Sequence, residues 1–123
     1  MTSLDKDLMS IQETRNLIMS AKKAQEIYKT FSQEKVDAIV KAVAAAAEKE
    51  ASRLAKMAFE ETGFGKWEDK IVKNTFASKV VYEKIKDMKT VGIIREEKVG
   101  KYFEVAVPVG VVAALIPSTN PTS

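Results

Sequence analysis

The first 89 residues place their apolar side chains three, four and seven positions apart, which is the spacing of one face of an α-helix. This pattern predicts three helices, over about residues 4–28, 32–63 and 67–87. Ser32 is placed as the N-cap of the second helix and Gly63 as its C-terminal cap, because serine accepts hydrogen bonds from free helical N–H groups and glycine adopts positive φ. The apolar stripe expected on the third helix consists of Ile71, Val72, Phe76, Val80 and Ile85.

From residue 90 the pattern changes to that of β-strands. Val91–Ile94 and Tyr102–Val107 are rich in β-branched and aromatic residues, and the polar segment Glu96–Lys101 between them contains a glycine. These features predict a β-hairpin over about residues 90–108. Pro108 ends it, because proline cannot donate a hydrogen bond to a neighbouring strand.

The segment Val111–Ile116 is apolar at every position and lies between Gly110 and Pro117. A strand of this kind is typical of a parallel sheet whose two faces are both covered. Each parallel neighbour is reached through a crossover of about a dozen residues or more, whereas only residues 117–123 follow this segment. The predicted fold class is therefore α/β, and we expect the chain to be the N-terminal piece of a larger protein.

Composition and charge exclude several classes of function. The chain carries 20 Lys and Arg against 17 Asp and Glu, and because the two signs alternate we expect no nucleic-acid partner. The sequence contains no cysteine and no histidine, which excludes disulfides, zinc sites, thiol nucleophiles and histidine acid–base chemistry, and no metal site is predicted. No targeting signal opens the chain, and residues 105–117, the longest uncharged apolar stretch, are too few to cross a bilayer; we expect a cytoplasmic protein without a membrane partner.

Two patterns that suggest chemistry have simpler explanations. Gly63–Gly65 falls short of the dinucleotide-binding fingerprint, because the third glycine is missing and a predicted helix precedes it. The pairs Glu60–Glu61 and Glu96–Glu97 cannot converge on one atom, because adjacent side chains do not share a face of a helix or strand. We interpret the glycines as a helix-capping turn and both glutamate pairs as surface charge.

The segment Pro117–Ser123 carries the most suggestive chemistry. It follows the carboxyl end of the predicted buried strand, which is where open α/β sheets bind their ligands. The carboxamide of Asn120 can donate a hydrogen bond to developing negative charge, as the side chain of an oxyanion hole does. Serine, threonine, asparagine and proline are also ordinary turn residues, so spacing alone leaves both interpretations open.

Gly110–Ser123, with the sequence GVVAALIPSTNPTS, resembles the first cofactor-domain strand and loop of coenzyme A (CoA)-acylating aldehyde dehydrogenases. The likeness is closest to the aldehyde dehydrogenase half of bifunctional aldehyde–alcohol dehydrogenases, and its Pro-Ser-Thr-Asn-Pro-Thr segment differs from the Pro-Trp-Asn form of non-acylating relatives. Upstream segments that share the resemblance are Leu54–Ala58, Glu61–Gly63, Glu68–Lys70, Lys73–Asn74 and Phe76–Ser78.

The resemblance covers the whole chain in order and implies a doubly wound, Rossmann-like NAD(P)-binding domain. The chain would supply its helical part (1–89), an oligomerisation hairpin (90–108) and its first strand with the active-site loop (109–123), so the domain would be incomplete. The hairpin would pair with a neighbouring subunit, which implies a homo-oligomer and agrees with the exposed β character of this segment.

The resemblance also implies a reaction. In such enzymes a cysteine thiolate attacks an aldehyde, here expected to be acetaldehyde, a hydride passes to NAD or NADP, and the resulting thioester is transferred to coenzyme A. By position, Asn120 would stabilise the oxyanion. The nicotinamide end of the cofactor cleft would be lined by Ile116, Pro117, Ser118 and Thr119.

One departure from the family is large. Its nucleophilic cysteine lies downstream, and this chain contains no cysteine, so the 123 residues alone are expected to be inactive. An acylating dehydrogenase for another aldehyde, such as sulfoacetaldehyde, succinic semialdehyde or propionaldehyde, fits the same residues. A stand-alone helical interaction or assembly module is the alternative from another class, although it would leave the apolar Val111–Ile116 strand uncovered.

Overall fold

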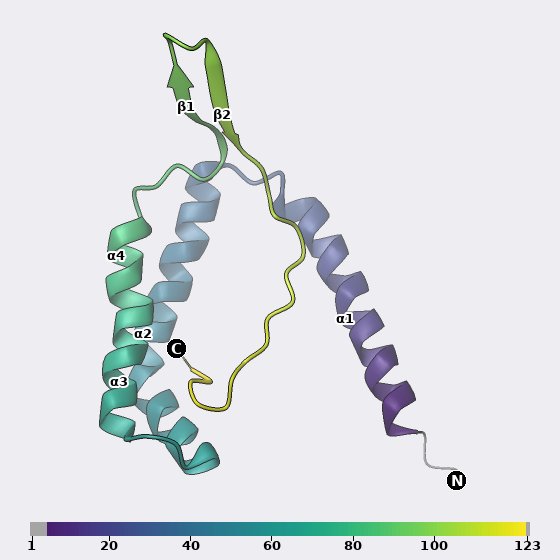
Figure 1. Cartoon of the computed structure of the whole chain (residues 1–123), viewed down its shortest axis with the longest axis vertical. Coiled ribbons are helices and arrows are strands. Elements are labelled where there is room, and N and C mark those ends of the chain that lie inside the picture. Colours follow the sequence, from purple (N-terminus) through teal and green to yellow (C-terminus); the bar gives the residue numbers. More distant parts are fainter. Residues whose placement is uncertain (1–4, 123) are drawn as a thin grey trace.

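Helices occupy most of the chain up to residue 85, and a two-stranded hairpin follows them (Figure 1). The structure is a computed structural model that describes residues 5–122, so the predicted helix start at Leu4 and the final residue Ser123 lie outside it. The elements in chain order are α1 (Lys6–Tyr28), α2 (Gln33–Thr62), α3 (Trp67–Thr75), the π-helical turn η1 (Phe76–Val80), α4 (Val81–Ile85), β1 (Gly92–Glu97) and β2 (Tyr102–Ala106). The helices and the hairpin predicted from the sequence are confirmed.

Helix α2 begins and ends at the two capping residues predicted for it. The Ser32 hydroxyl accepts a hydrogen bond from the Lys35 N–H at 3.4 Å. Gly63 has a φ of 68°, and its N–H donates to the Phe59 carbonyl at 2.8 Å. A side chain at this position would be strained, because L residues rarely adopt positive φ.

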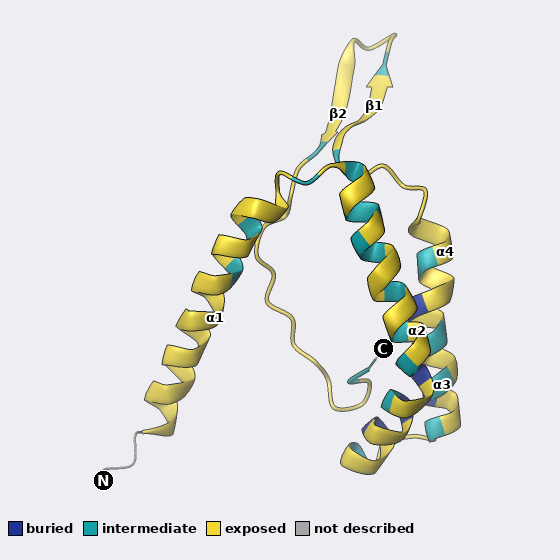
Figure 2. Cartoon of the chain, turned by 180° about the vertical axis from the view of Figure 1, so that it is seen from behind, coloured by how far each residue is buried: buried dark blue, intermediate teal, exposed yellow. Residues whose placement is uncertain are grey.

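Helices α3 and α4 are the two ends of one helical rod, joined by η1. The third predicted helix is therefore a single element over residues 67–85 that contains a π turn. Such a turn accommodates one extra residue in a helix and is uncommon. The rod lies beside α2 and runs in the opposite direction (Figures 1 and 2). An ion pair between Lys79 and Glu48, at 2.8 Å, links the two on the outside.

The contact between α2 and the rod joins small apolar residues to polar ones. The buried apolar residues of the described chain are Ala51, Ala55 and Ala58, and the buried residues of the rod are Lys70, Asn74 and Ser78. Alanine side chains allow two helices to approach closely. The rod residues recur every four positions and therefore share one face of the helix.

The predicted apolar stripe is therefore not the face that the rod buries. Val72 and Phe76 are 70% and 59% exposed. Two of the inward side chains, Lys70 and Asn74, form hydrogen bonds with α2 or with the end of the chain, and the Ser78 hydroxyl donates to the Asn74 carbonyl of its own helix. A buried polar group is stable when its hydrogen bonds are made.

Helix α1 diverges from α2 after the turn at residues 29–32 and packs on none of the other described helices and strands (Figure 2). Its apolar side chains, such as Leu17, are exposed. Near its end, Ala21 and Tyr28 line a shallow groove together with Gly110–Val112, and Tyr28 lines a second groove with Ile39 and Val40 of α2. None of the helices in residues 5–122 is both long and apolar enough to cross a membrane.

Strands β1 and β2 form an antiparallel hairpin that projects beyond the ends of α2 and α4 (Figure 1). Pairing runs from Gly92 opposite Ala106 to Glu97 opposite Tyr102. The side chains are largely exposed, including that of Phe103. A two-stranded hairpin is only marginally stable in water, so its base needs support from the helices.

Gln33, in the first turn of α2, provides this support. Its side-chain oxygen accepts hydrogen bonds from the N–H groups of Thr90 and Val91, at 2.8 and 2.9 Å. Its side-chain nitrogen donates to the Thr90 hydroxyl at 3.1 Å and to Asp37 at 2.7 Å. One side chain thus fixes the segment before β1 to α2.

The strand predicted over Val111–Ile116 is not formed. This segment runs as an irregular chain through the space between α1 and α2 (Figure 1), and Leu115 is 99% exposed. The one sheet within residues 5–122 is the hairpin. A strand needs a neighbour that takes up its backbone hydrogen bonds, and the parallel neighbours expected for this one are not among the described residues.

We predict that Gln33→Ala loosens the base of the hairpin. The substitution removes the acceptor of the Thr90 and Val91 N–H groups, and a hydrogen bond contributes about 0.5–1.5 kcal/mol net. Hydrogen exchange of these two amides, followed by NMR, should accelerate by roughly an order of magnitude. Gln12→Ala is the control, because Gln12 donates to Asn16 on the exposed surface of α1. Unchanged exchange at Thr90 and Val91 would show that the hairpin is held by other contacts.

Candidate active-site loop

The segment Pro117–Thr122, called the loop below, folds back onto the rod and ends beside α2 and α3 (Figure 1). It contains a turn, because the Asn120 N–H donates to the Pro117 carbonyl at 3.3 Å. The turn expected from the composition of this segment is therefore present. Side chains of α3 then hold the loop at three further points.

Lys70 holds the backbone of the loop. This residue is 4% exposed, and its Nζ donates to the Thr119 carbonyl at 3.0 Å. The side chain also lies against the turn between α2 and α3, since a Cβ added to Gly65 would be 3.8 Å from Lys70 Cε. Burying an ammonium group is costly unless it forms hydrogen bonds. The buried position of Lys70 thus depends on the carbonyl that the loop supplies.

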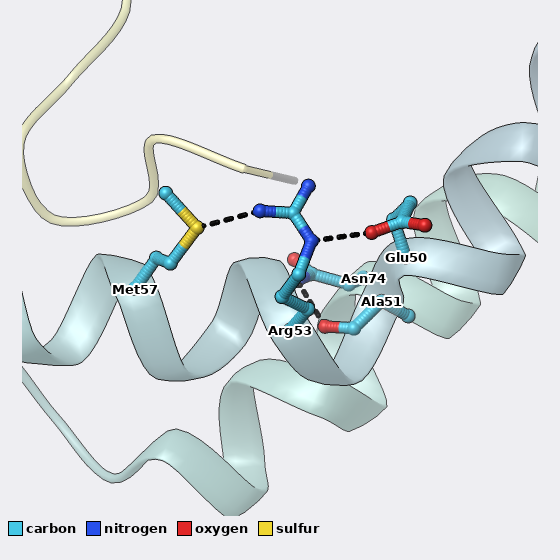
Figure 3. Close-up of polar contacts among 5 residues, drawn as sticks. All are labelled: Glu50, Ala51, Arg53, Met57 and Asn74. Carbon is cyan, nitrogen blue, oxygen red and sulfur yellow. Dashed lines mark hydrogen bonds and ion pairs between the residues drawn. The ribbon is translucent and has the colours of Figure 1, made fainter.

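Asn74 joins α3, α2 and the loop through one side chain. Its nitrogen donates to the Ala51 carbonyl at 3.0 Å (Figure 3), and its oxygen accepts from the Thr122 hydroxyl at 3.1 Å. Its main-chain carbonyl accepts from the Ser78 hydroxyl at 2.7 Å. Asn74 is 4% exposed, so these bonds replace the water that its amide loses on folding.

Asn120, the candidate oxyanion donor, is contacted at both ends of its side-chain amide. Lys73 Nζ donates to the Asn120 oxygen, and the Asn120 nitrogen donates to the Thr119 hydroxyl at 3.3 Å. Both Asn120 and Lys73 are exposed. The Asn120 amide therefore lies at the surface, on a loop that Lys70 and Asn74 hold against α3.

The four predicted cofactor-contacting residues precede Asn120 directly. The Ile116 side chain is 68% exposed, and Pro117 and Ser118 are also exposed. Thr119 also stabilises the loop, since its carbonyl accepts a hydrogen bond from Lys70 and its hydroxyl accepts one from Asn120. The loop brings the five candidate residues together, and their roles toward a ligand stay predictions.

The pattern of apolar and polar residues does not indicate Lys70, Lys73 and Asn74 as site residues. All three lie within segments that resemble the family. A signal was nevertheless present, because Lys70, Asn74 and Ser78 share one face of a helix. Three polar residues on a single face, opposite a stripe of alanines, indicate a buried hydrogen-bonded contact.

Arg53 and Glu50 form an ion pair on the neighbouring surface of α2. Arg53 donates to the Glu50 carboxylate at 2.5 Å and to the Met57 sulfur at 2.9 Å (Figure 3). This hydrogen bond to Arg53 lowers the pKa of Glu50. Within residues 5–122 no acidic cluster is placed to hold a metal ion. The cationic groups that contact the loop are those of Lys70 and Lys73.

Comparison with known proteins defines the class to which this fold and loop belong. Residues 7–122 match the model of the aldehyde dehydrogenase family. The chain therefore belongs to the aldehyde dehydrogenase family.

Three proteins to which the chain is similar are aldehyde dehydrogenases of the acetylating or bifunctional aldehyde–alcohol type. The bifunctional aldehyde-alcohol dehydrogenase of Escherichia coli K12 is 43% identical over 114 residues, which cover 93% of this chain and 13% of that protein. The succinate-semialdehyde dehydrogenase (acetylating) of Clostridium kluyveri is 47% identical over 107 residues, covering 87% of this chain and 24% of that protein. The crystal structure of an acetylating aldehyde dehydrogenase from Geobacillus thermoglucosidasius has a TM-score of 0.92 and 55% identity, covering 97% of this chain and 26% of that chain.

These findings confirm the resemblance to CoA-acylating aldehyde dehydrogenases and the fold class predicted from the sequence. The chain spans 13% and 24% of the length of the two curated relatives and 26% of the solved chain. The helices, hairpin and loop described above correspond to that part of the relatives.

We predict that Asn74→Ala lowers the free energy of unfolding by about 1–3 kcal/mol, the cost of leaving buried hydrogen-bonding groups without partners. The substitution removes the donor to Ala51 and the acceptor of the Thr122 hydroxyl. Urea unfolding followed by circular dichroism measures the change. Asn16→Ala, at an exposed position of α1, is the matched control. Equal midpoints for the two variants would mean that Asn74 does not support the contact.

Proposed function

We propose that these residues belong to an enzyme that oxidises a short aldehyde, with acetaldehyde as the expected substrate, to its acyl-CoA with NAD+ and coenzyme A. The reaction would be reversible. Membership of the aldehyde dehydrogenase family and 55% identity to an acetylating aldehyde dehydrogenase support the proposal. The nucleophilic cysteine would come from a part of the enzyme outside these 123 residues, which contain none.

The observation that carries the proposal is the arrangement of Asn120. Its amide is exposed on a turn whose backbone is fixed by Lys70 and whose end is fixed by Asn74. A hydrogen-bond donor that is already in place stabilises negative charge at an oxygen more effectively than one that must first reorganise. We assign Asn120 the role of donating its side-chain N–H to the aldehyde oxygen as that oxygen becomes negative.

The residues before Asn120 fit one end of a nicotinamide cofactor. Ile116 and Pro117 offer apolar surface to a planar ring, and Ser118 and Thr119 carry hydroxyl groups that can pair with its carboxamide. NAD+ or NADP+, when bound, supplies the acceptor for the hydride. The contribution of this chain is to orient the ring next to Asn120. We assign none of the described residues to coenzyme A.

We further propose a homo-oligomer in which the hairpin arm, residues 90–108, contacts a second subunit. The apolar side chains of Ile93, Phe103 and Val105 are exposed on the hairpin. Its two strands have no other neighbours among the described residues, so both edges can accept another strand. Gln33 holds the base of the arm, and this would limit the directions in which the arm can extend toward the second subunit.

Succinic semialdehyde is a second candidate substrate, because the Clostridium kluyveri relative is named for that aldehyde. Asn120 would serve either substrate, since it contacts the carbonyl oxygen and not the remainder of the aldehyde. The kcat/KM values for acetaldehyde, propionaldehyde, sulfoacetaldehyde and succinic semialdehyde would rank the candidates.

In the complete dehydrogenase polypeptide we expect Asn120→Ala to lower kcat by about 10²–10³, the loss typical of one oxyanion-hole donor. The affinity for NAD+ should change little, because the amide would contact the aldehyde oxygen. CoA-dependent NADH formation gives kcat, and fluorescence titration gives the Kd for NAD+. Asn16→Ala controls for loss of an exposed asparagine. Wild-type turnover by Asn120→Ala would remove Asn120 from the mechanism.

The 123-residue chain by itself should form no NADH from acetaldehyde, NAD+ and coenzyme A. The physical reason is that it has no cysteine to form the thioester. The same assay on the complete polypeptide is the positive control. Turnover by the isolated chain would contradict the thioester route.

A further inference from the structure

The side-chain amide of an asparagine has two unlike ends of nearly equal size. The oxygen only accepts hydrogen bonds, whereas the nitrogen donates two. Rotation of the Asn120 amide by half a turn would therefore replace a donor with an acceptor at the same place. An acceptor in that place would repel a developing oxyanion, so the proposed role of Asn120 requires that one orientation be selected.

The contacts of Asn120 select that orientation. Its oxygen is occupied by Lys73 Nζ, a charged donor. One of its two N–H groups is directed to the Thr119 hydroxyl at 3.3 Å. No acceptor within residues 5–122 takes the second N–H, which leaves it free for a ligand. The opposite orientation would place the NH2 group against the Lys73 ammonium, where donor faces donor.

We propose that Lys73 is a positioning residue for Asn120, which fixes the Asn120 oxygen and thereby presents the free N–H to the aldehyde oxygen. This inference rests on the oxyanion role proposed for Asn120. Lys73 acts in two ways. Its charge makes the flipped amide unfavourable, and its hydrogen bond to the oxygen polarises the amide so that the remaining N–H becomes a stronger donor.

Lys73 is separable from the residues that hold the loop itself. Lys70 fixes the Thr119 carbonyl and Asn74 fixes Thr122, and both are buried on the inward face of the rod. Lys73 lies on the exposed side and contacts the loop through the Asn120 side chain. Substituting Lys73 therefore changes the orientation of the amide and leaves the backbone anchors in place.

The first test reads the orientation directly and does not depend on activity. In the 15N-labelled chain, NMR should show nuclear Overhauser effects between the Asn120 side-chain N–H protons and the Thr119 side chain. We expect Lys73→Met to weaken these effects and Lys73→Arg to retain them, because arginine keeps a charged donor. Lys84→Met is the control, since Lys84 is an exposed lysine of α4 away from the loop. Unchanged effects in Lys73→Met would overturn the proposal.

The second test asks whether Lys73 acts through Asn120 during turnover. In the complete dehydrogenase, Lys73→Met should lower kcat by about tenfold, less than the loss expected from Asn120→Ala. The KM for the aldehyde should stay near the wild-type value, and Lys73→Arg should recover most of the loss. The double variant Lys73→Met/Asn120→Ala should be no slower than Asn120→Ala alone, because the two residues would act as one unit.

The outcomes of the two tests separate the two proposals. Multiplicative losses in the double variant would overturn the positioning role, since Lys73 would then act independently of Asn120. If Asn120→Ala retains full turnover, the oxyanion role fails, and the nuclear Overhauser effects still decide whether Lys73 orients the amide. A loss in Lys73→Met that Lys73→Arg does not restore would also overturn the proposal.

Discussion

The buried amide of Asn74 is the interaction on which the arrangement of α2, α3 and the loop depends. The apolar residues that are buried at this contact are three alanines. Burial contributes about 0.8 kcal/mol per carbon, whereas leaving a buried amide without its partners costs about 1–3 kcal/mol. The two quantities are of the same order. The packing of α2 against α3 therefore depends on the position of the loop, because the Thr122 hydroxyl donates to the Asn74 amide that the helices bury.

Lys70 is a second buried polar side chain whose hydrogen-bond partner comes from the loop, and its ammonium group carries a full charge. A lysine that is 4% exposed is held in place by a carbonyl from the loop, and the turn at Gly65 gives its side chain room. The scaffold thus requires the loop as much as the loop requires the scaffold. This mutual dependence gives the surface amide of Asn120 a fixed base, although Asn120 itself is exposed.

Features encoded by neighbouring residues could be predicted from the sequence, and features that depend on distant partners could not. The caps at Ser32 and Gly63, the hairpin and the turn before Asn120 each follow from the conformational preferences of a few adjacent residues. The inward face of the rod could not be found by counting apolar residues, because Lys70 and Asn74 have hydrogen-bond partners in the loop, almost fifty residues later in the chain. The segment Val111–Ile116 has the composition of a strand and no neighbouring strand to pair with in the described residues.

The π turn η1 determines how the two ends of the rod are aligned with each other. Successive residues of an α-helix are rotated by about 100° around the axis, and the extra residue of a π turn interrupts this progression. Lys70 and Asn74 before the turn face the loop, while Tyr82 and Ile85 after it line a groove with Val40 of α2. The rotational phase between these two faces is thus set by a single inserted residue. Loss of one residue from Phe76–Val80 would rotate one face out of register with its partner while leaving both helical ends intact, so the length of this short segment matters more than its composition.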